Sequence, residues 1–273
     1  MGISAAFLLS GFLLTVTLYA TVAIPLWGSR EPDLPQATAL QAAAGLVSFA
    51  LVTWLIGMRG ARLDGRALRW SPGGTAGFAR GLAIGAAPAV ATMLLAIPLA
   101  RARWMGDGGS ALAWMQDAGG LFGLLAPAAL LEEMMFRGVP LVVLASAFSR
   151  GTAIVGLGAL FGGFHLLNPG ITPLAVGNIA LAGVFLGVAF YLPGGLWTAT
   201  GAHLGWNLTL AALAAPVSGL PLPVDGVDYS PGTPVWLTGG EFGPEGGLLA
   251  TLALGLATLM VALRVRKAEE EAG

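Results

Sequence analysis

Two adjacent carboxylates and an arginine lie in a part of the sequence that is otherwise apolar. Glu132, Glu133 and Arg137 stand within the run from about residue 119 to residue 148. A charged side chain at the centre of a bilayer costs roughly 2.5–3.5 kcal/mol on insertion scales, so such groups normally face a partner or a water-filled cavity. A carboxylate beside a cavity can take a proton from water, which is a common step in hydrolytic reactions.

The spacing of the three charged residues predicts different roles for the two carboxylates. Neighbouring residues of a helix point in different directions, so Glu132 and Glu133 do not face the same group. Glu133 and Arg137 are four residues apart with the glutamate first, which is the favourable order for an ion pair on a helix. The sequence therefore predicts a Glu133–Arg137 pair and leaves Glu132 to face a cavity. A purely structural ion pair that ties helices together is the alternative.

Both histidines of the chain also lie in apolar segments. Phe161 and His165 are four residues apart, and so are His203 and Asn207, so each pair occupies one face of a helix. These two faces and Glu132 can converge in the middle of a bundle. Taken singly, each histidine is equally consistent with a hydrogen-bonded packing residue.

The converging groups allow two kinds of water activation. Glu132, His165 and His203 form a set of two histidines and one carboxylate, which can hold a catalytic zinc and leave a position for water. Without a metal, Glu132 and a histidine would polarise the water directly. In both cases His203 or Asn207 can stabilise an oxyanion. The His-Glu-x-x-His signature of soluble zinc proteases does not occur in the sequence.

The composition indicates an integral membrane protein. Hydrophobic residues make up 56% of the chain and charged residues only 10%, whereas a soluble domain carries about 25% charged residues. The net charge of −1 gives no support for nucleic-acid binding. The chain has no cysteine, which excludes disulfides, thiolate metal sites and cysteine nucleophiles.

The elements that must position these residues are membrane helices. A spanning helix needs about 20 mostly apolar residues, and the sequence predicts such segments near 3–27, 37–58, 77–100, 119–147, 152–167, 173–192, 196–215 and 247–264. Pro127 predicts a kink in the fourth segment, just before the glutamates. Glycines four residues apart predict close helix packing at Gly81/Gly85, Gly119/Gly123, Gly158/Gly162, Gly183/Gly187 and Gly201/Gly205. We expect an all-α polytopic bundle that forms one integral-membrane domain over 1–273, with its motif-bearing core at about 119–215.

The distribution of basic residues predicts the orientation. Cytoplasmic loops of membrane proteins are enriched in Lys and Arg. Eight spans with both termini in the cytoplasm place there Arg59, Arg62, Arg66, Arg69, Arg80, Arg150, Arg264, Arg266 and Lys267. The loop from about 216 to 246 carries four acidic residues and no basic residue, so we expect it outside the cytoplasm. Its glycines and prolines favour a turn-rich connector over a ligand site.

The three motifs together resemble those of a known family. Glu132-Glu133-Met134-Met135-Phe136-Arg137, then Phe161 to His165, then His203 to Asn207 match the order and spacing of the CAAX-processing and bacteriocin-processing (CPBP, or Abi) intramembrane proteases. The motifs span about 75 residues, and none departs from the family pattern. The expected eight-helix topology is similar to that of the type II CAAX prenyl proteases of this family.

The resemblance implies a role for each acidic and basic motif residue. Glu132 would activate the attacking water, Glu133 would support it, and Arg137 would hold the glutamates in place. His165 would act with Glu132 on the water or on a metal.

The remaining motif residues would contact the substrate or its intermediate. His203 and Asn207 would stabilise the oxyanion, although His203 could instead be a metal ligand, and Phe161 would be a packing or substrate-contact position. The family is described as metal-dependent, which implies a divalent metal such as zinc with Glu132, His165 and His203 as ligands. The implied partners are a peptide or prenylated protein substrate and the lipid bilayer, and the implied location is a prokaryotic plasma membrane.

Two other classes of function remain open at the level of sequence. A secondary transporter could use the glutamates and histidines as a proton relay, but the sequence has no inverted repeat. A non-catalytic membrane adaptor or immunity protein could keep the same fold and motifs. The intact motifs favour an intramembrane metalloendopeptidase over both of these classes.

Overall fold

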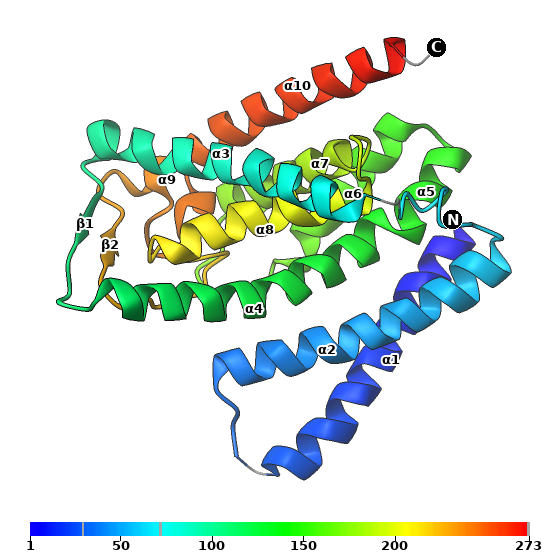
Figure 1. The fold of residues 1–273 in the computed structure, drawn as a ribbon, viewed down its shortest axis with the longest axis horizontal. Coiled ribbons are helices and arrows are strands. Elements are labelled where there is room, and N and C mark those ends of the chain that lie inside the picture. Colours follow the sequence, from blue (N-terminus) through cyan, green and yellow to red (C-terminus); the bar gives the residue numbers. More distant parts are fainter. Residues whose placement is uncertain (29, 71–72, 272–273) are drawn as a thin grey trace.

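The protein is mostly helical (Figure 1). The computed structural model describes residues 1–28, 30–70 and 73–271. The long helices are α1 (Gly2–Trp27), α2 (Leu34–Val52), α3 (Gly74–Ala100), α4 (Ala111–Arg137), α5 (Val139–Ala147), α6 (Arg150–Phe164), α7 (Pro173–Ala189), α8 (Leu196–Ala212) and α10 (Leu248–Glu270). The remaining elements are the π-helix η1 (Thr53–Gly60), strands β1 (Arg103–Met105) and β2 (Asp228–Ser230), helix α9 (Val235–Thr238) and two 3₁₀ turns, η2 (Gly240–Phe242) and η3 (Pro244–Gly246).

Several helices begin where a polar side chain can cap the first turn. Ser110 accepts a hydrogen bond from the Ala113 backbone N–H at 3.1 Å and starts α4. Ser149 starts α6 and Thr172 starts α7 in the same way. Capping satisfies backbone donors that the first turn leaves free. The three helices that carry or support the histidines and glutamates therefore have fixed starting points.

The fourth predicted segment forms two helices, with a break that the sequence analysis did not predict. Helix α4 runs without interruption through Pro127 and ends at Arg137, and α5 starts at Val139. The break lies at Gly138, with Pro140 two residues further on. Pro140 has no N–H, and its ring would clash with the carbonyl four residues earlier if the helix continued. The chain therefore turns directly after the charged motif.

Four helical segments in the described part of the chain are long and apolar enough to cross a membrane. They are Gly2–Trp27, Leu34–Gly60, Gly74–Ala100 and Leu248–Glu270. Helices α6 and α7 are apolar but shorter, and α4 carries the charged motif. Exposed leucines such as Leu9 and Leu256 give the outer helices apolar surfaces that suit lipid. The chain is an integral membrane protein.

Helix α8, which carries His203 and Asn207, packs directly on the backbone of α3. A Cβ atom at Gly85 would lie 1.8 Å from the Ala202 carbonyl oxygen, and one at Gly205 would lie 2.3 Å from the Leu82 oxygen. Only glycine allows this approach, which is the way small residues bring membrane helices together. The predicted seams at Gly81/Gly85 and Gly201/Gly205 are thus one interface, and it fixes the position of His203.

Among the other predicted glycine pairs, some pack against a neighbouring helix and one does not. Gly158 and Gly183 face one another across the α6–α7 interface, where a Cβ at Gly183 would lie 2.8 Å from the Gly158 Cα atom. Gly119 and Gly123 on α4 have no heavy atom of the described residues within 4 Å of an added Cβ, so the prediction of a packed seam there is wrong.

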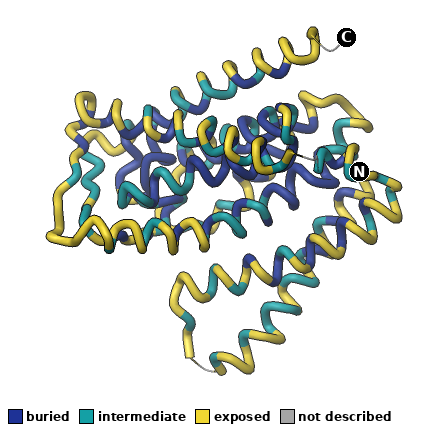
Figure 2. Tube along the Cα trace, in the orientation of Figure 1, coloured by how far each residue is buried: buried dark blue, intermediate teal, exposed yellow. Residues whose placement is uncertain are grey.

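Helices α1 and α2 form a hairpin that projects from the rest of the bundle, as Figure 1 shows at its lower right. Most of its residues are exposed, whereas buried residues gather on α7, α8 and the inner part of α4 (Figure 2). At the opposite end of the molecule, β1 and β2 pair antiparallel, with Trp104 opposite Tyr229. The motif-bearing helices therefore lie between a short β-ribbon and a projecting hairpin.

Candidate active site

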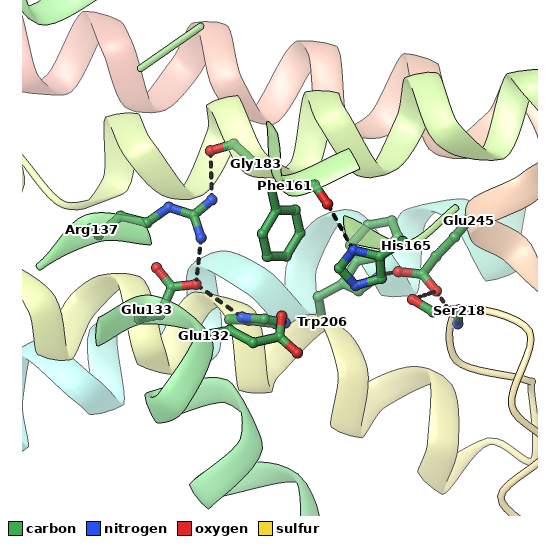
Figure 3. A network of polar contacts seen from close by, with 10 residues as sticks. Glu132, Glu133, Arg137, Phe161, His165, Gly183, Trp206, Ser218 and Glu245 are labelled. Carbon is green, nitrogen blue, oxygen red and sulfur yellow. Dashed lines mark hydrogen bonds and ion pairs between the residues drawn. The ribbon is translucent and has the colours of Figure 1, made fainter. Parts of the chain in front are cut away.

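The ion pair predicted from the helical spacing is present and buried. The Nη1 atom of Arg137 lies 3.0 Å from Oε1 of Glu133, and both side chains are at most 1% exposed. Arg137 also donates from Nη2 to the Gly183 carbonyl oxygen on α7 at 2.7 Å. Its guanidinium carbon lies 4.8 Å from the centre of the Phe161 ring. The pair therefore joins α4 to α6 and α7 (Figure 3).

His203 lies between the two glutamates of the motif. Its Nδ1 atom is 2.9 Å from Glu133 Oε1, and its Nε2 atom is 3.7 Å from Glu132 Oε2. A carboxylate is an acceptor only, so Nδ1 carries the proton and donates to Glu133. This contact fixes the orientation of the ring and directs Nε2 toward Glu132.

Glu132 has a buried oxygen that none of the described residues satisfies. Its side chain is 32% exposed, but Oε2 is buried and accepts no hydrogen bond from them. A water placed about 2.8 Å from both Glu132 Oε2 and His203 Nε2 would form ordinary hydrogen bonds to each. The geometry therefore suits a water held between a carboxylate and an imidazole.

His165 and Asn207 reach the same cavity from other directions. His165 follows the last residue of α6, and its Nδ1 atom lies 2.8 Å from the Phe161 carbonyl oxygen. That contact leaves Nε2 available on the other side of the ring. The Phe161 ring lies between the two histidines, with its centre 4.8 Å from that of His165 and 5.8 Å from that of His203. Asn207 lies one turn beyond His203 on α8.

A cavity of about 730 Å³ connects these groups. Its polar lining includes Glu132, His165, His203 and Asn207, and its apolar wall comes from α1, α2, α4, α7 and neighbouring segments. The volume lies in the range of cavities that hold small ligands. The cavity thus brings together five of the residues singled out in the sequence, these four and Phe161, while Glu133 and Arg137 support them from behind.

Sequence reasoning missed a second polar network on the same cavity. Glu245 is only 6% exposed and lines the cavity together with Trp206 and Ser218. Trp206 Nε1 donates to Glu245 Oε1 at 3.1 Å, and the Ser218 hydroxyl donates to Oε2 at 3.0 Å. The backbone N–H of Ser218 also donates to Oε2. The segment expected to be a connector is therefore folded into the cavity wall (Figure 3).

The metal predicted from the donor set can be tested against the geometry. Glu132 and His203 approach one another, and the contact of His203 Nδ1 with a carboxylate is typical of metal-binding histidines. However, the residues that the structure describes include no group of three or more His, Asp or Glu side chains arranged to hold a metal ion. Of the three expected ligands, the structure therefore brings Glu132 and His203 together, and it does not group His165 with them.

Comparison with known proteins locates the motifs within one family model. Residues 114–209 match the model described as type II CAAX prenyl endopeptidase Rce1-like. The matched range contains every motif residue from Glu132 to Asn207, and it excludes Ser218 and Glu245. Neither a curated protein nor a solved structure matches the chain.

Proposed function

Because this chain belongs to the CAAX protease family, we propose that it is an intramembrane endopeptidase that uses Glu132 to activate water. The observation that carries the proposal is the buried Glu132 Oε2, which lies 3.7 Å from His203 Nε2 and accepts no hydrogen bond from the described residues. Its substrate is a membrane-associated peptide or protein, of CAAX type or related to bacteriocin processing.

The reaction follows from the placement of these groups. Glu132 takes a proton from the water, whose oxygen forms a bond to the carbonyl carbon of the peptide. When His203 is protonated, both ring nitrogens donate: Nδ1 to Glu133, and Nε2 toward the cavity. The Nε2 donor and the Asn207 amide then stabilise the oxyanion. Collapse of the intermediate breaks the C–N bond, and Glu132 returns its proton to the leaving amine.

The other residues orient this machinery. Glu133 holds the His203 ring, and Arg137 balances the charge of Glu133. His165 faces the same cavity and can hold the water or the substrate carbonyl through Nε2. Phe161 fills the space between the two histidines, which keeps both rings in place.

The test is the cleavage of a quenched peptide library by the full-length protein in lipid nanodiscs. Glu132→Gln keeps the shape of the side chain but removes the base, so we expect cleavage to fall by about 10²–10⁴-fold. Glu241→Gln is the matched control, because Glu241 is exposed and lies off the cavity. Retention of full activity in Glu132→Gln would remove Glu132 from the mechanism. An adaptor protein would keep its biological effect in both variants.

We also propose that a divalent metal, zinc by the family resemblance, binds this protein when it is active. Glu132 and His203 Nε2 are the two donors that already face each other. The test is the metal content per chain, measured in the wild type and in the variants His165→Ala and His203→Ala. About one equivalent that both variants lose supports a metal site. A folded, active protein without metal rules out the proposal.

We also propose that the chain crosses a prokaryotic plasma membrane eight times. Both termini then lie in the cytoplasm. The chain has no cysteine, so single cysteines can be placed as Arg66→Cys and Asp225→Cys. In sealed right-side-out vesicles we expect a membrane-impermeant thiol reagent to label only Asp225→Cys. Labelling of Arg66→Cys from outside would contradict the orientation.

A further inference from the structure

Glu245 is a buried carboxylate without a cationic partner among the described residues. Its three hydrogen-bond donors are the Trp206 indole, the Ser218 hydroxyl and the Ser218 backbone N–H, all of them neutral. Its backbone carbonyl accepts from Asn178 Nδ2 at 2.7 Å, and Asn178 in turn accepts from Thr251. The side chain is therefore held rigidly in the cavity wall, with its charge stabilised by dipoles and not neutralised.

The lining of the cavity includes two carboxylates and no Lys or Arg among the described residues. Glu132 and Glu245 contribute carboxylates, whereas none of the described lining residues is Lys or Arg. The Glu132 Oε2 atom adds a buried acceptor that those residues leave unsatisfied. In a site shielded from water, opposite charges attract and like charges repel more strongly than in solution. A ligand with a cationic group is favoured over one with a carboxylate.

We propose that Glu245 makes this cavity selective for peptide segments that carry a Lys or Arg side chain near the scissile bond. The inference rests on the proposed protease function, because it names the substrate class of that site. It also excludes substrates that would place an acidic side chain or a free carboxylate against Glu245. Such discrimination by charge is a usual source of specificity at binding sites.

The position of Glu245 limits where the basic residue lies. Its partner Trp206 follows His203 by three residues on α8, a rise of about 4.5 Å along the helix axis. An extended peptide advances about 3.3 Å per residue. The side chain that meets Glu245 therefore belongs to a residue within a few positions of the bond that Glu132 and His203 attack.

The experiment compares peptides that differ at one position. Quenched peptides carry Lys, Gln or Glu at each of four positions on either side of a central bond, and the full-length protein in nanodiscs cleaves them. Binding of the same peptides without the quencher is measured by fluorescence anisotropy with Glu132→Gln, which does not cleave. We expect the wild type to prefer Lys over Glu by tenfold or more at one position. Glu245→Gln should reduce that preference to within about threefold.

Glu241→Gln is the matched control, since it makes the same change on an exposed residue in the same loop. It should keep the wild-type preference. A preference for Glu, no preference in the wild type, or an unchanged preference in folded Glu245→Gln would overturn the proposal. If Glu245→Gln fails to fold, the peptide binding of Glu132→Gln decides the proposal, because Glu245 is then the one carboxylate left in the described lining.

The two readouts separate this proposal from the protease function. Cleavage without charge preference leaves the protease in place and overturns the selectivity. Binding that prefers Lys and depends on Glu245, with no cleavage in the wild type, supports the ligand class and removes the protease. Absence of both binding and cleavage overturns both.

Discussion

Glu133 and Glu245 are both almost completely buried, but only Glu245 lines the cavity, and the groups that stabilise the two carboxylates differ. Glu133 pairs with the guanidinium of Arg137 at 3.0 Å and with His203 Nδ1 at 2.9 Å. Glu245 accepts from an indole, a hydroxyl and a backbone N–H. One carboxylate is neutralised by a cation, and the other is stabilised by neutral donors alone.

The difference shows that a carboxylate inside a membrane protein can either stabilise the fold or remain available to interact with a ligand. An ion pair with excellent geometry offsets the cost of burial, but its carboxylate charge is then neutralised by the cation and is not free to attract a ligand. Hydrogen bonds from neutral donors stabilise a carboxylate without cancelling its charge. The charge of Glu133 therefore serves to hold His203 in place. The charge of Glu245 can still attract a cationic group of a ligand in the cavity.

The largest effect is expected from loss of the cation. Arg137→Ala leaves Glu133 buried without its main partner, so the free energy of unfolding should fall by about 3–5 kcal/mol. Denaturation in mild detergent measures the loss. Arg266→Ala is the control, because its ion pair with Glu270 is exposed and such pairs contribute about 0.3–0.5 kcal/mol. Equal losses in the two variants would mean that burial does not distinguish the two pairs.

A smaller effect is expected from loss of one neutral donor. Trp206→Phe keeps an aromatic ring but removes the N–H that Glu245 accepts, and a hydrogen bond to a charged group is worth about 1.5–3 kcal/mol. Trp104→Phe removes a hydrogen bond to the neutral Leu213 carbonyl, so it should cost about 0.5–1.5 kcal/mol. Because the smaller ring also affects packing, the coupling of Trp206→Phe with Glu245→Gln in a double-mutant cycle isolates the hydrogen bond. No coupling would contradict the assigned contact.

The sequence predicted the first network because its signals are local. The apolar runs place the helices, and the polar caps at Ser110, Ser149 and Thr172 begin three of them. The Glu133–Arg137 pair follows from a four-residue spacing on one helix. The convergence of Glu132 with the histidine faces was expected because polar groups are costly in apolar segments and gather where they can satisfy one another. The hydrogen bond from His203 to Glu133 was not expected.

The second network depends on contacts between distant parts of the chain. Glu245 lies 39 residues from Trp206 and 27 from Ser218, and no helical or strand period relates them. The glycines and prolines around Glu245 predict turns, but they do not tell whether those turns fold back into a cavity. The break at Gly138 was also missed, because Pro127 and Pro140 are the same residue type and the sequence does not tell which of them ends the helix.

The smallest effect is expected from a donor whose loss the carboxylate can tolerate. Ser218→Ala removes the hydroxyl that donates to Glu245 Oε2, but the backbone N–H of residue 218 still donates to the same oxygen. We expect a loss of about 1 kcal/mol in the free energy of unfolding, below the range of about 1.5–3 kcal/mol for a hydrogen bond to a charged group. Ser146→Ala is the control, since its hydroxyl is exposed and donates to a neutral carbonyl, and a surface change of this kind stays within about 0.5 kcal/mol. A loss as large as that of Arg137→Ala would show that Glu245 depends on this hydroxyl as strongly as Glu133 depends on its cation. The contrast between the two carboxylates would then be one of geometry and not of charge.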